Sequence, residues 1–126
     1  VLIERFATGE TDFARTSWIA DFPDPSNFLW LFYGKNVPDD PHARSLPNFS
    51  RYKNPLFDEY LEKGMASIDP NEQLKYYNMC DSILVADAAF LPLYHDQYIR
   101  LVQNNIVGFP INAMEYRDLT RVFKSK

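Results

Sequence analysis

The sequence predicts a mixed α/β (or α+β) fold, and three observations favour it. Apolar and aromatic runs at both ends of the chain are typical of strands. Between them, residues 55–68 and 69–85 each open on a helix-start signal and continue with apolar residues at helical spacing. The 126 residues are 46% hydrophobic and 24% charged, which is a globular composition with enough length for a buried core. An order of strands, helices and strands indicates a mixed architecture.

The first twenty residues are predicted to be rich in β-structure. Residues 1–3 and 13–19 are apolar runs on either side of a polar turn cluster around Gly9. The chain opens on an apolar run and without an initiator methionine. We therefore expect residues 1–126 to be one segment of a longer polypeptide, with no internal domain boundary.

Prolines separate this β-rich region from a short helix. Pro23 and Pro25 stand at alternate positions and forbid a continuing strand. Asp24 is a suitable N-cap and Pro25 a suitable first helical residue, so a helix is predicted that ends at Gly34. Its apolar residues are Phe28, Leu29, Leu31 and Phe32. From residue 36 to 54, three prolines and little periodicity predict a long loop, and such loops are often functional.

Two longer helices are predicted next. Asn54 and Pro55 form a cap and a first-turn proline, and an apolar stripe follows at spacings of four, four and three: Phe57, Leu61, Met65 and Ile68. Asp69 with Glu72 is a second start signal, for a helix that runs to about Val85. Four of its side chains are expected to face inward: Tyr76, Cys80, Ile83 and Leu84.

The last third of the chain is predicted to contain strands. Residues 90–94 and 98–102 are the stronger candidates, and Pro92 places the first at a sheet edge or a strand start. Residues 106–109 and 119–123 are weaker candidates.

Composition excludes several classes of site. The net charge is −4 and no cluster of Lys and Arg exists, so we expect no nucleic-acid binding. The single cysteine, Cys80, cannot form a disulfide within the chain or a multi-cysteine zinc site, and it lacks neighbours that would make it a nucleophile. His42 and His95 stand in no ligand-spaced motif. We expect no metal, no cofactor and no catalytic residue.

The strongest candidate for a binding site is residues 18–25. A strand that ends in Asp21, stiffened by prolines and followed at once by a helix, would present a carboxylate at a cleft. Trp18 and Phe22 would form an apolar wall, beside which an ion pair with a ligand ammonium is strengthened. Spacing alone leaves other interpretations open. Asp24 could serve only as a helix cap, and Asp21 only as a turn residue. Alternatively, the two could form a carboxylate pair of the kind that glycosidases use.

Residues 18–29 (WIADFPDPSNFL) resemble a motif of the oligopeptide and dipeptide (family 5) solute-binding proteins of ABC transporters. The family pattern is Trp-x-Ala-Asp-aromatic-x-Asp-Pro-x-Asn-Phe-Leu. Residues 48–58, 69–81, 90–94 and 107–108 resemble later family segments in the same order. Phe22 stands where Tyr is commoner, and Gln73 stands near a frequent Arg; neither change removes the acidic residue of the motif.

The resemblance implies a fold and a function. The fold would be part of the C-terminal lobe of a two-lobed (type II, clamshell) periplasmic-binding protein. In peptide-binding members the motif aspartate pairs with the peptide α-amino group, and Asp21 is the matching residue. Trp18 and Ile19 would occupy neighbouring cleft positions. The implied role is the capture of short peptides for a membrane permease, without catalysis.

The same resemblance implies the partners and the location. The remainder of the polypeptide would complete the cleft, and ABC permease subunits would receive the ligand. The protein would lie in the periplasm or on the extracytoplasmic face, free or lipid-anchored. Three alternatives remain open: a small carboxylate-dependent hydrolase, a standalone interaction domain with an aromatic surface, or the same fold binding a nickel chelate, haem or a sugar.

Overall fold

The computed structural model describes residues 2–126 and divides the chain into two compact units, which are described separately. The N-terminal unit extends to Leu91 and carries all the helices of the described chain, and the C-terminal unit comprises Pro92–Lys126. The predicted mixture of helix and strand is present, although the only strands among the described residues form a small sheet in the C-terminal unit. The prediction of one segment without an internal boundary stays a prediction.

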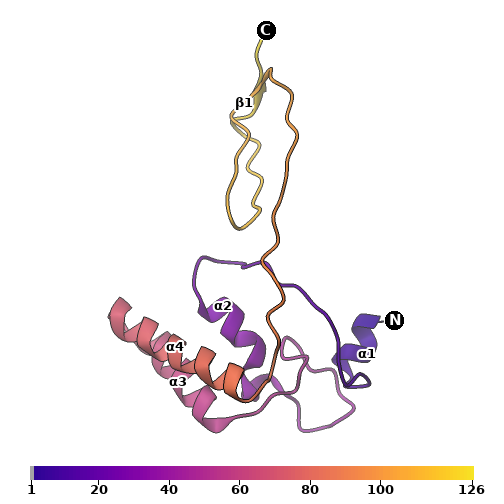
Figure 1. Cartoon of the computed structure of the whole chain (residues 1–126), viewed down its shortest axis with the longest axis vertical. Coiled ribbons are helices and arrows are strands. Elements are labelled where there is room, and N and C mark those ends of the chain that lie inside the picture. The colour runs from indigo at the N-terminus through magenta and orange to yellow at the C-terminus, as the bar shows by residue number, and fades with distance from the viewer. Residues whose placement is uncertain (1) are drawn as a thin grey trace. The chain divides into compact units, whose positions relative to one another are not determined.

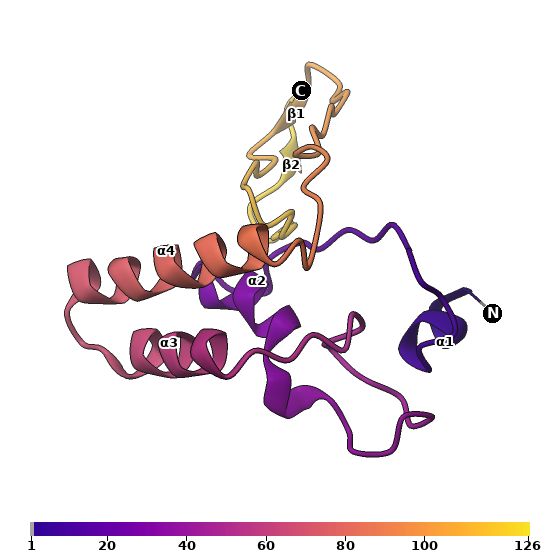
Figure 2. The same cartoon turned by 60° about the horizontal axis from the view of Figure 1, so that its bottom comes forward.

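A pair of helices, α3 (Pro55–Ala66) and α4 (Pro70–Ala86), lies side by side in the N-terminal unit and forms its main helix contact (Figures 1 and 2). Both begin as predicted, each with a proline in the first turn. Asn54 Oδ1 accepts from the backbone N–H groups of Leu56 and Phe57, and the Asp69 side chain accepts from that of Asn71.

The two helices approach closely at Gly64. A Cβ at this position would lie 2.5 Å from Cε1 of Tyr77, which is far inside van der Waals contact. Gly64 therefore lets the Tyr77 ring of α4 lie directly against α3. The core cluster around this contact is made of buried side chains: Leu29, Tyr33, Phe57, Leu61, Tyr77, Cys80 and Leu84.

Three details of the predicted helix faces are wrong. Ile68 is 98% exposed because α3 has already ended at Ala66, and Met65 is also exposed because Gly64 takes the buried position. On α4 the buried tyrosine is Tyr77, whereas Tyr76 is only half-buried and packs its ring against Tyr60.

A shorter element, α2 (Ser26–Leu29), packs against both α3 and α4. Two 3₁₀ turns continue from it, η1 (Trp30–Phe32) and η2 (Gly34–Asn36), so the predicted apolar helix is present in a shorter and tighter form. Of its four predicted apolar residues only Leu29 is buried. Helical structure resumes at Gly34, where the helix was expected to end, and the Gly34 N–H donates to Asp58 Oδ1 of α3 over 2.8 Å.

The loop between residues 37 and 54 has no regular element, as predicted, but it is held in place by the side chain of Asn48. This side chain is completely buried. Its Nδ2 donates to the carbonyls of Tyr33 and Tyr52 (3.0 and 2.9 Å), and its Oδ1 accepts from Ser50 Oγ and the Tyr52 N–H. The amide thus supplies part of the pairing that the loop lacks, and the Ser45 N–H adds a backbone hydrogen bond to the Ala7 carbonyl (2.9 Å).

The predicted strand at the N-terminus is wrong over its described part. Leu2–Ala7 form helix α1, and Val1 lies outside the described residues. Gly9, at φ +77°, ends this helix rather than forming a hairpin turn: the N–H groups of Gly9 and Glu10 donate back to the carbonyls of Phe6 and Arg5.

Residues 13–19, 90–94 and 98–102 were also predicted as strands, and none of them is one. A strand needs a neighbour with which to exchange backbone hydrogen bonds, and the described chain supplies none for these segments. Several of their apolar side chains are consequently exposed, among them Phe13 (84%), Ile99 (88%) and Leu101 (98%).

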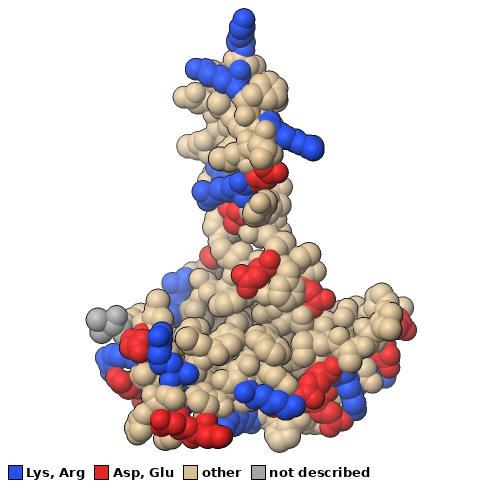
Figure 3. Space-filling model, turned by 180° about the vertical axis from the view of Figure 1, so that it is seen from behind, with Lys and Arg blue, Asp and Glu red and all other residues tan. Residues whose placement is uncertain are grey.

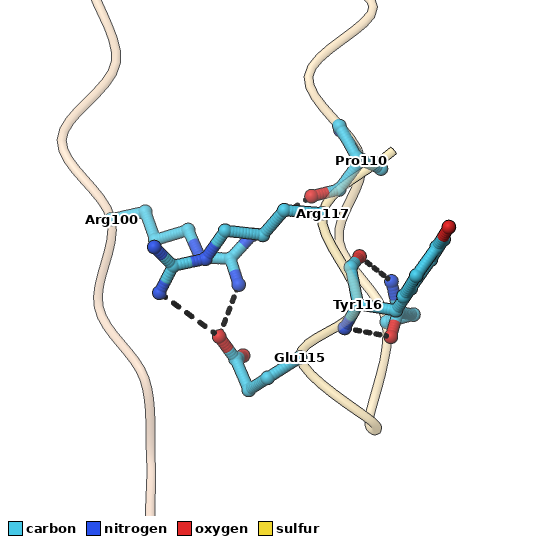
Figure 4. Close-up of polar contacts among 6 residues, drawn as sticks. Arg100, Pro110, Glu115, Tyr116 and Arg117 are labelled. Carbon is cyan, nitrogen blue, oxygen red and sulfur yellow. Dashed lines mark hydrogen bonds and ion pairs between the residues drawn. The ribbon is translucent and has the colours of Figure 1, made fainter. Parts of the chain in front are cut away.

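The C-terminal unit contains the short antiparallel strands β1 (Ile106–Val107) and β2 (Phe123–Lys124), which lie within or beside the two weaker predictions. The side chain of Arg100, which precedes β1, is bonded to the loop that joins the two strands (Figure 4). Its guanidinium donates to the Pro110 carbonyl (2.9 Å) and to Glu115, and it lies over the Phe109 ring. The Arg100 and Glu115 side chains are 16% and 15% exposed, so this unit depends on a largely buried ion pair as well as on its small sheet.

Gly64→Ala tests the close packing of α3 and α4. In an open helix this change stabilises by roughly 1 kcal/mol, but here the new methyl group meets the Tyr77 ring. We expect the free energy of unfolding in urea to fall by about 1–3 kcal/mol. In a Tyr77→Leu background the same change should be neutral or stabilising. Equal losses in both backgrounds would contradict this packing.

The pH dependence of Tyr52 tests a polar contact that joins the start of α3 to the end of α4. Tyr52 Oη and Asn54 Nδ2 both donate to Asp87 Oδ2 (2.5 and 2.8 Å). Burial, then the bond to Asp87, raises the pKa of Tyr52 to about 12. The resulting stabilisation should be complete below pH 10 and be lost between pH 10 and about 12.

The titration can be followed by NMR of ¹³Cζ-labelled tyrosine, with the Tyr52 signal assigned from Tyr52→Phe. Asp87→Asn should lower the pKa of Tyr52, while Asp81→Asn on the exposed side of α4 should leave it unchanged. A Tyr52 that ionises near pH 10 in the unmodified protein would show that the link is absent.

Candidate functional site

The segment that carries the predicted site, residues 18–25, has no helix or strand of its own. It leads directly into α2. The Ser26 N–H donates to Asp24 Oδ1 over 2.8 Å, so Asp24 stabilises the start of the helix from just before it, close to the predicted capping role. Because this segment has no ladder of backbone hydrogen bonds, its position depends on side-chain contacts.

The main contact is the side chain of Asn27, the second residue of α2. Its Oδ1 accepts from the indole Nε1–H of Trp18 (2.7 Å) and from the backbone N–H of Asp21 (3.2 Å). Its Nδ2 donates to Asp21 Oδ2 (3.3 Å). Asn27 is only 6% exposed. A single buried amide therefore joins Trp18 and Asp21, two of the three residues that the sequence pointed to.

A pocket of about 250 Å³ opens beside this contact. Its walls are mostly aromatic or aliphatic, with Asp21 and Asn27 as its polar groups: Trp18, Asp21, Phe22, Asn27, Trp30, Leu31 and Pro47. A carboxylate in an apolar recess suits a ligand that combines a cation with an apolar group. Ile19, the third predicted residue, is 45% exposed and does not line this pocket.

Four lining residues were not singled out from the sequence: Asn27, Trp30, Leu31 and Pro47. Asn27 stood within the recognised motif, but its hydrogen bonds reach back six and nine residues and follow no helical or strand period. Pro47 comes from the loop that Asn48 holds in place. A loop wall of this kind depends on tertiary contacts that no local pattern encodes.

A second, larger hollow of about 620 Å³ lies along α3 and α4. It is an open groove whose walls include the exposed Leu56 and Leu74 and the cation Lys75. None of the residues predicted for the site lines it. The pocket at Asp21 is smaller but brings a carboxylate together with aromatic walls, so we take it as the candidate site.

Other chemistry has little support in the described residues. No group of three or more His, Cys, Asp or Glu side chains within residues 2–126 is placed to hold a metal ion. Cys80 is fully buried, its Sγ lies 3.7 Å from the Phe57 carbonyl, and burial raises the pKa of its thiol to about 11. The predicted burial of Cys80 is therefore confirmed, and its lack of reactivity stays a prediction that the raised pKa favours. None of the described helices is long and apolar enough to cross a membrane.

Charged side chains are interspersed over the surface of the N-terminal unit. In the view of Figure 3, Lys and Arg alternate with Asp and Glu across this unit, without a continuous region of one sign. Several of them form exposed pairs, such as Lys63 with Glu59 and Arg44 with Glu4. Such pairs contribute little stability.

Comparison with known proteins gives a consistent set of relatives. The chain is 32% identical to the periplasmic murein peptide-binding protein MppA of Escherichia coli over 86% of its own length. It is 30% identical to di/tripeptide-binding protein 2 of Pseudomonas aeruginosa over 96% of its length. With the periplasmic oligopeptide-binding protein OppA of Salmonella typhimurium it shares 28% identity over 80%. The predicted resemblance to family 5 solute-binding proteins is confirmed.

The chain spans about a fifth of the length of these relatives, with shares of 18%, 22% and 17%. No protein-family model and no solved structure matches it. A family 5 relationship is consistent with a fragment of one lobe, in agreement with the helix pair and small sheet described above.

Proposed function

We propose that this chain is part of the C-terminal lobe of a two-lobed solute-binding protein that captures short peptides for an ABC importer. The observation that carries the proposal is the position of Asp21, a motif carboxylate at the edge of an aromatic pocket. The peptide-binding names of the relatives support the choice of ligand class.

In the proposed complex the carboxylate of Asp21 pairs with the α-amino group of the peptide. Trp18 forms an apolar wall beside it, and Ile19, exposed on the same segment, contacts the ligand or the opposite lobe. Asp21 is exposed in this structure, so the pair would gain most of its strength when closure of the lobes removes water.

No bond is made or broken in this mechanism. The remainder of the polypeptide supplies the opposite wall of the cleft, and the closed form docks on a membrane permease. The periplasmic names of the relatives support a location in the periplasm or on the extracytoplasmic face. Main-chain hydrogen bonds and side pockets would tolerate several peptide sequences.

The hydrolase alternative is less well supported. It needs Asp21 and Asp24 to act together on a substrate, but Asp24 Oδ1 accepts a hydrogen bond from the backbone at the start of α2. The relatives are named as binding proteins, which supports a non-enzymatic role. Nickel chelates, haem and sugars remain as other ligands of the same fold, and the experiment below separates them from peptides.

Asp21→Asn in the complete protein tests the proposal. We expect binding of trialanine, measured by isothermal titration calorimetry, to weaken by roughly 2–5 kcal/mol, because the peptide ammonium loses a desolvated charge partner. N-acetyl-trialanine, which lacks that ammonium, should bind the unmodified protein more weakly than trialanine does, by a comparable amount of free energy.

Asp81→Asn, an exposed carboxylate on α4, is the matched control and should leave the affinity unchanged. Equal binding of trialanine by the Asp21→Asn variant and the unmodified protein would remove Asp21 from the site. If neither peptide binds, native mass spectrometry of the gently purified protein would identify a metal chelate, haem or sugar in its place, and the peptide proposal would be wrong.

A further inference from the structure

We infer that Asn27 is the positioning residue of the proposed ligand site and fixes the Asp21 carboxylate and the Trp18 indole relative to each other. The inference rests on the proposed function, because it assigns the residue through which Asp21 acts. It is carried by the three hydrogen bonds of one buried amide, and nothing in the relatives' names bears on it.

Among the described residues, the backbone of residues 18–21 forms no hydrogen bond with another backbone group. Residues 18–21 belong to no helix or strand, and the backbone N–H of Asp21 donates to a side chain, Asn27 Oδ1, instead of to a main-chain carbonyl. A segment without a ladder is free to move unless side chains hold it. Asn27 is therefore the principal restraint on the backbone at Asp21.

The amide of Asn27 uses both of its ends in these contacts. The Asn27 Oδ1 has two lone pairs, and both are used, one by Trp18 Nε1–H and one by Asp21 N–H. The Nδ2 donates to Asp21 Oδ2, so the carboxylate is turned by the same group that holds its backbone. The other carboxylate oxygen, Oδ1, is then left for the ligand ammonium.

Asn27 is itself held by the helix on which it lies. It lies on α2, its N–H donates to the Asp24 carbonyl over 3.1 Å, and it is 6% exposed. Two residues later Leu29 enters the core formed by α3 and α4. The position of the charge at the pocket is thus set by the packed helices, through a single side chain.

Other residue types at position 27 would not do this. Alanine leaves the Trp18 and Asp21 N–H groups, whose hydrogen bonds to Asn27 are partly buried, without their partner. Serine is too short to reach both of them. Aspartate has no donor for Asp21 Oδ2 and places a second negative charge beside it. Only an amide of this length offers two acceptor lone pairs together with a donor.

The test measures trialanine binding to Asn27→Ala and Asn27→Ser in the complete protein. We expect each variant to lose about tenfold in affinity, as for the loss of one buried hydrogen bond. In an Asp21→Asn background the same changes should cause a much smaller loss of affinity, because Asn27 acts mainly through Asp21 and only its contact with Trp18 remains to be lost. A merely structural role would weaken binding equally in both backgrounds. Asn78→Ala, an exposed asparagine on α4, should bind as the unmodified protein does.

A second readout follows the contact itself. The Trp18 indole proton, identified in NMR spectra by its loss in Trp18→Phe, should exchange slowly with solvent in the unmodified protein and at least tenfold faster in both Asn27 variants. Dispersion of the backbone amide signals in the same spectra shows whether each variant is folded, so Asn27→Ser carries the test if Asn27→Ala is unfolded.

The outcomes separate the two proposals. If the unmodified protein binds trialanine and the Asn27 variants bind it equally well, the positioning role is overturned and the proposed function stands. Additive losses in the Asp21→Asn background would also overturn it. If the unmodified protein binds no peptide, the proposed function fails and the positioning role fails with it, even where the indole proton is protected.

Discussion

The hydrogen bonds of the Asn27 amide are the constraint on which the candidate site depends. The segment around Asp21 has no regular secondary structure, so packing of its own backbone cannot place the carboxylate. Asn27 transfers the rigidity of the helices to that segment, since α2 packs against α3 and α4 and carries the amide at its second residue. The packed core fixes α2, α2 fixes the Asn27 amide, and the amide fixes the Asp21 carboxylate.

Asparagine side chains hold several of the irregular segments of the described chain. Asn48, completely buried, ties the long loop to the carbonyls of Tyr33 and Tyr52. Asn54 caps α3 with its oxygen while its nitrogen donates to Asp87 at the end of α4. A primary amide offers a donor and an acceptor a short distance apart, so it can imitate a piece of a ladder in an irregular region. The length of the side chain must match in each case, because a shorter or longer side chain misses one partner.

Capping residues, prolines and a short motif predicted the parts of the fold that depend on neighbouring residues in the sequence. The starts of α3 and α4 follow from a cap and a proline at adjacent positions, and the pocket residues Trp18 and Asp21 follow from a motif. Strands were overpredicted because apolar runs show only that a segment is suited to pairing. The buried face of α4 was misjudged at Tyr77, since its contact with Gly64 lies on another helix. Asn27 was missed as a separate site residue because its hydrogen bonds reach back six and nine residues to a segment without regular structure.

The most direct test of the account is a crystal structure of the complete protein with trialanine bound. The account predicts the peptide amino nitrogen within hydrogen-bond distance of Asp21 Oδ1, with Asn27 Nδ2 still on Oδ2 and the Trp18 indole still bonded to Asn27. An amino group bound elsewhere, or an Asp21 side chain turned away from Asn27 to meet it, would contradict the account.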